Sequence, residues 1–99
     1  MVTKDEAKRY ISDAPPEQCF WVNNGQILRN VEELANALAQ MSEETFHYHA
    51  NKDKNDFSNW TNDVIGDKKL ANDLLSSRNK ESALKKVENR LNSIKKRLL

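Results

Sequence analysis

Apolar residues recur at spacings of three and four along most of the chain, which is the repeat of an amphipathic helix. The pattern is clearest in residues 31–41, and shorter versions of it occupy residues 4–11, 56–65 and 68–75. Each stripe predicts a helix that buries one face. The predicted core positions are Ala7, Tyr10 and Ile11; Val31, Leu34, Ala35, Leu38 and Met41; Phe57, Trp60 and Val64; and Leu70, Ala71, Leu74 and Leu75.

Residues that can accept hydrogen bonds from the first turn of a helix precede these stripes. Thr3 and Glu6 form a capping box, in which each side chain can bond the other residue's backbone N–H. Gly66 lies where a left-handed C-cap usually ends a helix. The predicted N-caps are Thr3, Asn30, Ser42, Asn55, Asp67 and Asn79, and Ser42 begins a short helix that reaches about residue 50.

Residues 20–28 have a different pattern, which predicts a small β-hairpin. Two short β-prone runs, Phe20-Trp21-Val22 and Ile27-Leu28, flank the sequence Asn23-Asn24-Gly25-Gln26. Asn-Gly tolerates a positive φ at both positions, as a type I′ turn requires. A hairpin this short is marginal alone, so we expect it to lie against the helices.

The last helix is predicted over residues 80–98, and its apolar residues form a narrow seam. Steps of 3, 4, 3 and 4 separate Leu84, Val87, Leu91, Ile94 and Leu98. Such an a/d seam suits one opposing helix or groove. The seam can pack on the body of the same domain, associate with a second copy, or dock to another protein.

These elements predict a mainly α fold, a compact bundle of about five to six short helices with the N-terminal hairpin and a longer basic C-terminal helix. Ninety-nine residues are typical of one domain, so we expect a single domain over residues 1–99. A chain this short has few apolar residues to spare for a deep substrate cavity.

Composition indicates the cellular compartment in which we expect the protein. One cysteine, Cys19, permits no internal disulfide. The charged N-terminus lacks the apolar stretch of a signal peptide, and no apolar run approaches the ~20 residues that span a bilayer. We therefore expect a cytoplasmic protein that does not bind membranes.

Charge is distributed unevenly along the chain. Residues 1–67 hold 6 Lys or Arg and 12 Asp or Glu, whereas residues 68–99 hold 10 and 3 respectively. The two parts therefore carry net charges of −6 and +7, which sum to the overall +1. This asymmetry permits two interpretations: the two parts attract each other within one fold, or the basic part binds an anionic partner.

Residues 46–67 contain the residues that could carry chemistry. His47 and His49 are two apart, which places them about 200° apart on a helix and prevents them from sharing a metal ion. A carboxylate pair of Asp56 and Asp63, with His49 as a base, is the remaining enzyme or metal hypothesis. A structural role at a helix end accounts for most of these acidic residues. Asp56, for example, lies in a first helical turn, where its negative charge is stabilising.

A structural role for this segment is therefore favoured. Asn51, Asn55 and Asp67 are expected to bond the backbone at helix ends. Phe57 and Trp60 are expected to fill much of the core. His49 is expected to be partly buried and hydrogen-bonded, and His47 to lie on the surface.

The same segment resembles the signature of a small helical domain family from archaea and some bacteria. The resemblance covers roughly residues 19–76, including the hairpin with Asn24-Gly25 and the helix start at Val31-Glu32-Glu33-Leu34. It implies a recurring fold, found in small proteins or attached modules, without an assigned activity. The residues that carry it are His49, Asn51, Lys54, Asn55, Asp56, Phe57, Trp60, Asp63, Val64, Gly66 and Asp67.

The sequence is most typical of a protein-interaction or regulatory module without catalysis or cofactor. We expect its partner, another protein or a second copy, to bind the C-terminal helix. The candidate contact residues are Leu84, Val87, Leu91, Ile94, Lys86, Arg90 and Arg97. The alternative is non-specific nucleic-acid binding through the same basic helix, and the third hypothesis is an enzyme or metal site at His49, Asp56 and Asp63.

Overall fold

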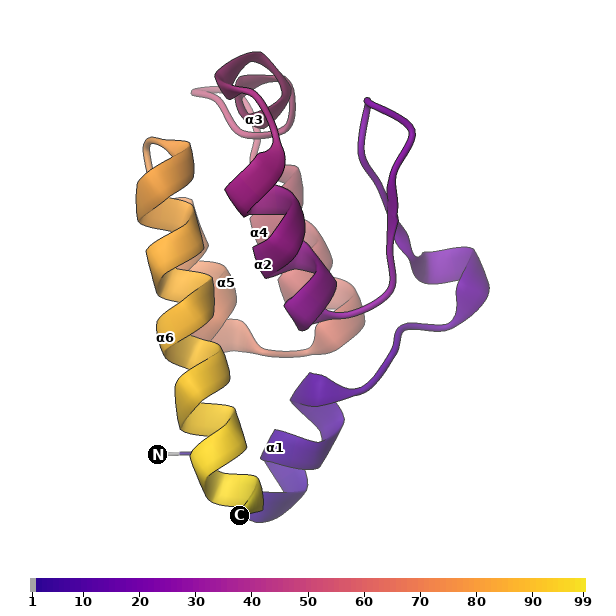
Figure 1. The fold of residues 1–99 in the computed structure, drawn as a ribbon, viewed down its shortest axis with the longest axis vertical. Helices are drawn as coiled ribbons and strands as arrows, with labels where there is room; N and C mark the ends of the chain where they lie inside the picture. Colours follow the sequence, from indigo (N-terminus) through magenta and orange to yellow (C-terminus); the bar gives the residue numbers. More distant parts are fainter. Residues whose placement is uncertain (1) are drawn as a thin grey trace.

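A computed structural model describes residues 2–99, so the first residue of the predicted domain lies outside it. The described residues form the predicted helical bundle with one two-stranded antiparallel hairpin (Figure 1). The α-helices are α1 (Lys4–Ile11), α2 (Val31–Gln40), α3 (Glu43–His49), α4 (Asp56–Trp60), α5 (Lys68–Leu75) and α6 (Lys80–Leu98), and the strands are β1 (Phe20–Trp21) and β2 (Ile27–Leu28).

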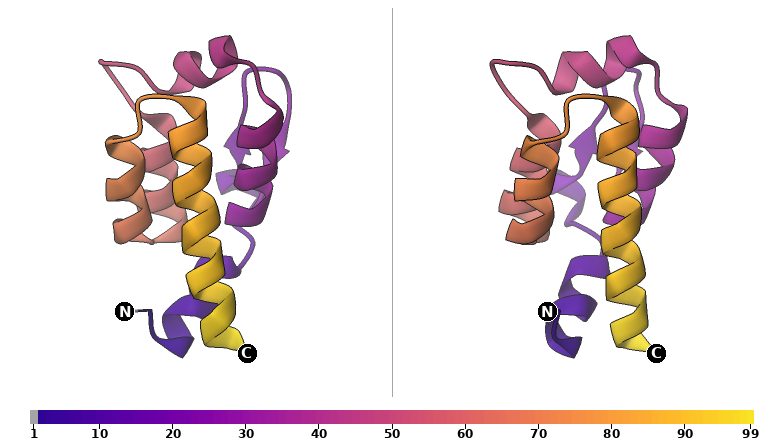
Figure 2. Two further views of the ribbon diagram at one scale, coloured as in Figure 1. Left: turned by 60° about the vertical axis from the view of Figure 1, so that its left-hand side comes forward. Right: turned by 90° about the vertical axis from the view of Figure 1, so that its left-hand side faces the viewer.

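Helix α6 is the longest element, and the other helices are arranged around it. Figure 2 shows α6 with α5 on one side and α2 on the other, and α1 packs beside its C-terminal part. The hairpin lies on the far side of α2, and α3 covers one end of the bundle (Figure 1). Each predicted N-cap accepts a hydrogen bond from the first turn of its helix, from Thr3 to Asn79.

The apolar seam of α6 is buried inside the domain. Val87 and Ile94 are fully inaccessible, Leu91 is 6% exposed, and Leu84 is partly buried against the same core. They pack on α1, α2 and α5 of their own chain. The seam therefore packs on the body of its own domain, which is the first of the three arrangements that its pattern permits. A partner could reach Val87, Leu91 and Ile94 only by displacing α6.

Basic side chains of α6 also bind their own domain. Lys80 donates to the carbonyl of Met41, and Lys95 pairs with Glu32 at 2.8 Å. Lys86 donates to the carbonyl of Asp73 at 3.1 Å and to the hydroxyl of Ser76 at 2.8 Å. The contacts of Lys80 and Lys95 join the basic part of the chain to the preceding part, as the first of the two interpretations of the charge asymmetry expects, whereas those of Lys86 stay within residues 68–99.

The strongest of these contacts joins Arg90 to Asp67, whose side chain is buried. Arg90 donates from Nε at 2.7 Å and from Nη2 at 2.9 Å, and the same carboxylate caps α5 by accepting the N–H of Leu70. Burial lowers the pKa of Arg90, but the bonds to Asp67 outweigh it, and the pKa is raised above its ordinary value. Arg90 is therefore held as a cation by a single carboxylate.

The hairpin has the predicted strands but a different turn. Phe20 pairs with Leu28 and Trp21 with Ile27. The predicted type I′ turn is wrong, because it needs a positive φ at Asn24, and among the described residues only Gly25 (φ 99°) and Gly66 have one. The N–H of Gly25 bonds the carbonyl of Val22, and Val22 N–H bonds the carbonyl of Gln26, as in a three-residue hairpin loop with a left-handed glycine.

Helix α4 does not continue to Gly66 as a regular helix. Residues Thr61–Ile65 form a wider turn, a π-helix, that ends at Gly66 with φ 85°. The extra residue per turn moves the buried face from i+4 to i+5 after Trp60. Ile65 is consequently 4% exposed, and the predicted core residue Val64 is only partly buried.

We expect Arg90→Met to destabilise the domain by about 3–5 kcal/mol, because it leaves the buried carboxylate of Asp67 without its partner. Lys95→Met removes a cation of the same helix from a pair whose side chains are each 50% exposed, and it should cost about 0–1 kcal/mol. Urea denaturation of both variants measures the difference. Equal losses would show that Asp67 does not depend on Arg90.

Candidate functional site

The outer face of the hairpin exposes two large apolar side chains. Trp21 is 73% exposed and Ile27 is 51% exposed. They are direct cross-strand partners, so their side chains lie next to each other on one face. We call these two residues the hairpin face. Their neighbours Phe20 and Leu28 point the other way and are buried.

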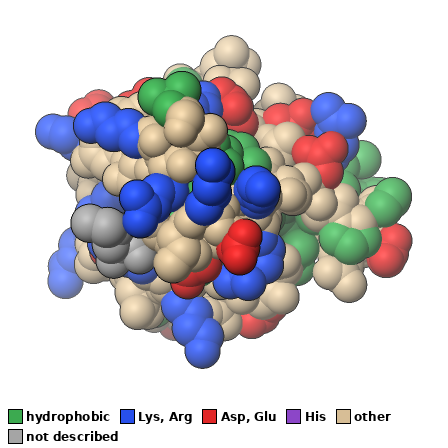
Figure 3. Space-filling view, turned by 90° about the horizontal axis from the view of Figure 1, so that it is seen from below, with side chains coloured by type: hydrophobic (Ala, Val, Ile, Leu, Met, Phe, Trp, Pro, Cys, Tyr) green, Lys and Arg blue, Asp and Glu red, His purple; other side chains and the backbone are tan. Residues whose placement is uncertain are grey.

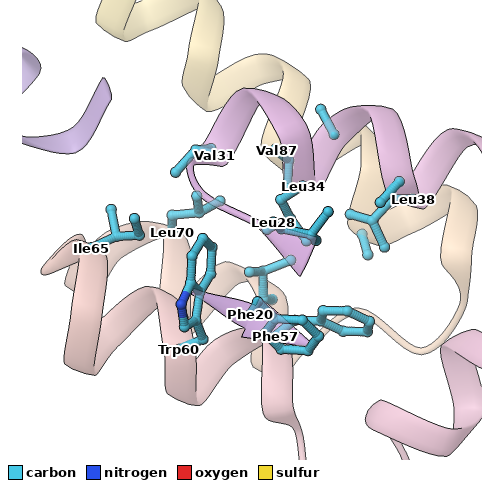
Figure 4. Close-up of a cluster of buried hydrophobic side chains, with 14 of the residues drawn as sticks. Phe20, Leu28, Val31, Leu34, Leu38, Phe57, Trp60, Ile65, Leu70 and Val87 are labelled. Carbon is cyan, nitrogen blue, oxygen red and sulfur yellow. The ribbon is translucent and has the colours of Figure 1, made fainter. Parts of the chain in front are cut away.

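The inner face of the hairpin rests on aromatic rings. Phe20 stacks on Phe57 with ring centroids 5.2 Å apart, and it meets Trp60 edge-on at 5.8 Å and His49 edge-on at 5.1 Å. Figure 4 shows Phe20 beside Phe57 and Trp60 of α4, with Leu28 near Leu34 of α2. Offset and edge-to-face ring pairs contribute about 0.5–1.5 kcal/mol each beyond their burial. The rings therefore hold the hairpin at a fixed orientation.

Two hydrogen bonds fix the backbone on either side of β1. The indole Nε1 of Trp60 donates to the carbonyl of Gln18 at 2.8 Å, before the strand. The N–H of Asn23 donates to Nε2 of His49 at 3.0 Å, after it. Both side-chain partners belong to the polar, aromatic segment that resembles a family signature. This segment supports the hairpin in the folded chain.

The hydrogen bond from Asn23 determines which ring nitrogen of His49 carries the proton. A backbone N–H can only donate, so Nε2 must accept, and the proton of a neutral ring resides on Nδ1. Nδ1 lies 3.0 Å from Oδ2 of Asp56 and donates to it. His49 is 4% exposed, as the sequence led us to expect, and both of its ring nitrogens are occupied. It has no free lone pair with which to accept a proton from a substrate.

Asp56 accepts a second hydrogen bond, from the ammonium group of Lys54. Nζ of Lys54 lies 3.0 Å from the same Oδ2 and 4.9 Å from the ring centroid of Tyr48. Partial burial raises the pKa of Asp56, but the hydrogen bonds from His49 and Lys54 outweigh it, so its pKa lies below the ordinary value of 3.8. The carboxylate thus stays charged and keeps the His49 ring oriented.

The remaining residues of the segment have separate local roles. Asn55 caps α4 and donates to the carbonyl of Leu74, and Asn51 donates to the carbonyl of His47. Asp63 lies exposed on the π-helical turn and, among residues 2–99, accepts only from its neighbour Asn62. The structure therefore brings His49 and Asp56 together and leaves Asp63 outside their contact.

No three His, Cys, Asp or Glu side chains in residues 2–99 lie together in a way that could hold a metal ion. Within the same residues, no helix has the length and apolar composition needed to cross a membrane. Comparison with protein-family models, with curated proteins and with solved structures finds no match to this chain. The resemblance to a family signature stays a prediction.

Sequence reasoning did not single out the hairpin face. The signal was present, because alternation along two paired strands places Phe20 and Leu28 on one face and Trp21 and Ile27 on the other. Helices can cover only one face of a two-stranded hairpin at the edge of a bundle. One large apolar pair had to remain exposed, although the sequence did not indicate which.

We expect the Asp56 carboxylate to contribute stability that is present at neutral pH and lost in acid. Because its folded pKa is lowered, the contribution is complete above the ordinary value and disappears as pH falls below about 4. The variant Asp56→Asn cannot titrate. Its stability deficit relative to the parent protein should therefore shrink between pH 7 and pH 3 in urea titrations, and a constant deficit would contradict the pairing.

Proposed function

We propose that the protein is a small binding module without catalysis, and that it binds another protein through the hairpin face. The observation that carries this proposal is the exposure of Trp21 beside Ile27 on a hairpin that is otherwise firmly held. Tryptophan is the residue type most enriched among those that dominate binding energy. Leaving it in water is unfavourable for a side chain that could be buried.

The support of the hairpin matters for affinity. Association costs the ordering of loops and side chains, and a surface that is already ordered avoids part of that cost. The ring contacts of Phe20 and the two backbone bonds at Gln18 and Asn23 provide this order. In this proposal, the segment 46–60 contributes to binding by orienting the hairpin rather than by touching the partner.

The size of the hairpin face favours a short apolar segment of another protein as its occupant. A stable dimer buries about 800 Å² per partner. A whole tryptophan or other aromatic side chain supplies roughly 150–250 Å², so Trp21 and Ile27 together fall well short of that area. A folded partner with a standard interface, a second copy of this chain included, is therefore the less favoured occupant, and a short segment of a cytoplasmic partner protein is the proposed one.

Non-specific binding of nucleic acid is a second candidate, supported by one observation. Lys and Arg side chains gather at the lower end of the molecule (Figure 3), where Lys69, Arg90, Lys96 and Arg97 border a hollow. Many cations on one surface can neutralise phosphates and release counterions. However, Arg90 and Lys69 are already paired with Asp67 and Asp73, which reduces the charge available to a polyanion.

A gel-shift titration with RNA or DNA tests this second candidate. We expect any such binding to weaken steeply between about 50 and 200 mM salt, since it would rest on phosphate contacts. Lys96→Glu should weaken it further. Binding that is insensitive to salt and to this substitution would contradict the role of the basic end.

We expect Trp21→Ser to abolish capture of the partner protein and to leave the fold intact, because the side chain is exposed in the free protein. The protein, tagged at its C-terminus, would be used to capture partners from extracts of its native cells. Proteins retained by the parent and lost with the variant would then be identified by mass spectrometry. Far-UV circular dichroism and thermal unfolding verify that the variant is folded.

Leu75→Ser is the matched control, since Leu75 is 61% exposed but lies at the end of α5. It should retain every specific partner. A purified partner should also shift the fluorescence emission of Trp21 to shorter wavelength. The emission of Trp60 should not change, because its side chain is already buried. Capture that is equal for the parent, Trp21→Ser and Leu75→Ser would refute the proposal.

A further inference from the structure

A second candidate binding site lies where α3, the turn at residues 51–55, α4 and the connection between α5 and α6 meet. These segments border a hollow of about 850 Å³ at the surface. This volume falls within the ~300–1,000 Å³ typical of small-molecule sites. We call it the loop hollow, and its lining residues are His47, Ala50, Asn51, Lys52, Asp53, Lys54, Asn55, Asn59, Leu75, Ser77 and Arg78.

The loop hollow carries positive charge that its surroundings do not neutralise. Lys52 borders it from the turn and Arg78 from the connection between α5 and α6. Within residues 2–99, neither has a carboxylate within ion-pair distance, whereas Lys54 is paired with Asp56. Asp53 is the one acid in the lining. The balance therefore favours an anionic ligand.

The polar groups available to a ligand come from three different segments. Asn59 of α4 lines the hollow, and its amide makes no hydrogen bond among the described residues. Together with Lys52 and Arg78, it offers donors from three segments of the chain. Three donors suit the three terminal oxygens of a phosphate ester better than the two oxygens of a carboxylate, and arginine can bind phosphate with two parallel bonds.

The lining also contains an apolar part. Leu75 was expected in the core from its position in the helical stripe, but it is 61% exposed and lines the hollow beside Ala50. An exposed leucine next to unpaired cations suits a ligand with an anionic end and an apolar or aromatic body. Inorganic phosphate would use only the first of these features.

We propose that the loop hollow binds a small phosphate monoester with an apolar or aromatic body. Lys52, Arg78 and Asn59 contact the phosphate, and Leu75 packs on the body of the ligand. The site is separate from the hairpin face, because it uses no residue of the hairpin. The proposal goes beyond the binding of a partner protein and does not depend on it.

The other basic hollow, at the lower end of the molecule, is a weaker candidate for the same chemistry. It is smaller, at about 400 Å³, and two of its cations already have carboxylate partners. It provides an internal comparison, since a ligand that follows charge alone would bind at both places.

The experiment is a titration of the whole protein with phenyl phosphate, followed by two-dimensional NMR of backbone amides. We expect saturable shifts confined to residues 50–55, 59 and 75–79. Inorganic phosphate should bind the same residues about tenfold more weakly, the loss expected for about 1.4 kcal/mol of apolar contact. Benzoate at the same ionic strength should bind more weakly than phenyl phosphate.

Two variants test the assigned contacts. Arg78→Gln and Lys52→Ala should each weaken phenyl phosphate binding about tenfold, as expected for the loss of a charge-assisted contact. Lys85→Ala removes an exposed cation of α6 outside the hollow and should leave the affinity unchanged. Because all three side chains lie on the surface or in a turn, the variants should fold, and their amide spectra verify it.

The proposal is overturned if no saturable shift occurs at up to about 10 mM ligand, a concentration at which a weak site of ~1 mM affinity would be nearly filled. It is also overturned if the shifts appear equally around Lys69 and Lys96, or if Lys85→Ala has the same effect as Arg78→Gln. Trp21→Ser should not alter phenyl phosphate binding, so the failure of either proposal can be recognised without reference to the other.

Discussion

A hairpin with two residues in each strand cannot stand alone in water, and this constraint accounts for much of the surrounding structure. Its inner residue Phe20 lies on a surface of three rings, and its backbone is held before and after the first strand by Trp60 and His49. Nε2 of His49 can accept from the backbone because the ring proton resides on Nδ1, which donates a hydrogen bond to Asp56. A histidine in contact with an aspartate is an arrangement familiar from catalytic sites. In this protein the pair supports the backbone next to β1.

Two ion pairs join the oppositely charged parts of the chain within the described residues. Lys95 and Arg90 reach Glu32 and Asp67, and Arg90 does so at a buried carboxylate that also caps α5. The exposed pair contributes little, whereas the buried pair is costly to break from either side. Together with the buried seam, these contacts make α6 part of the core. The exposed apolar pair that we propose as a binding surface lies instead at the hairpin, far along the sequence from the basic helix.

The features that could be predicted from sequence are those decided within one or two helical turns. Thr3 with Glu6, and Asn30, Asn55, Asp67 and Asn79 as caps, all follow from contacts three residues away. Features decided by tertiary packing were not predictable. The π-helical turn buries Ile65 in place of Val64, Leu75 faces solvent, and His49 binds Asn23 across 26 residues. Likewise, the seam of α6 has the same pattern whether its opposing surface belongs to this chain or to another.

A chain of contacts links the two proposed surfaces through the turn of residues 51–55, and the strength of its weakest contact limits how far one surface can influence the other. Lys52 lines the loop hollow, and Lys54 reaches Asp56, which orients the histidine that holds Asn23. The Lys54 pair is exposed, with side chains 43% and 32% accessible, so it contributes at most ~1 kcal/mol. A ligand that displaced Lys54 would therefore change the affinity at the hairpin by no more than about fivefold. The ring contacts and the Trp60 bond would remain in place, so the two proposed surfaces would act as nearly independent sites.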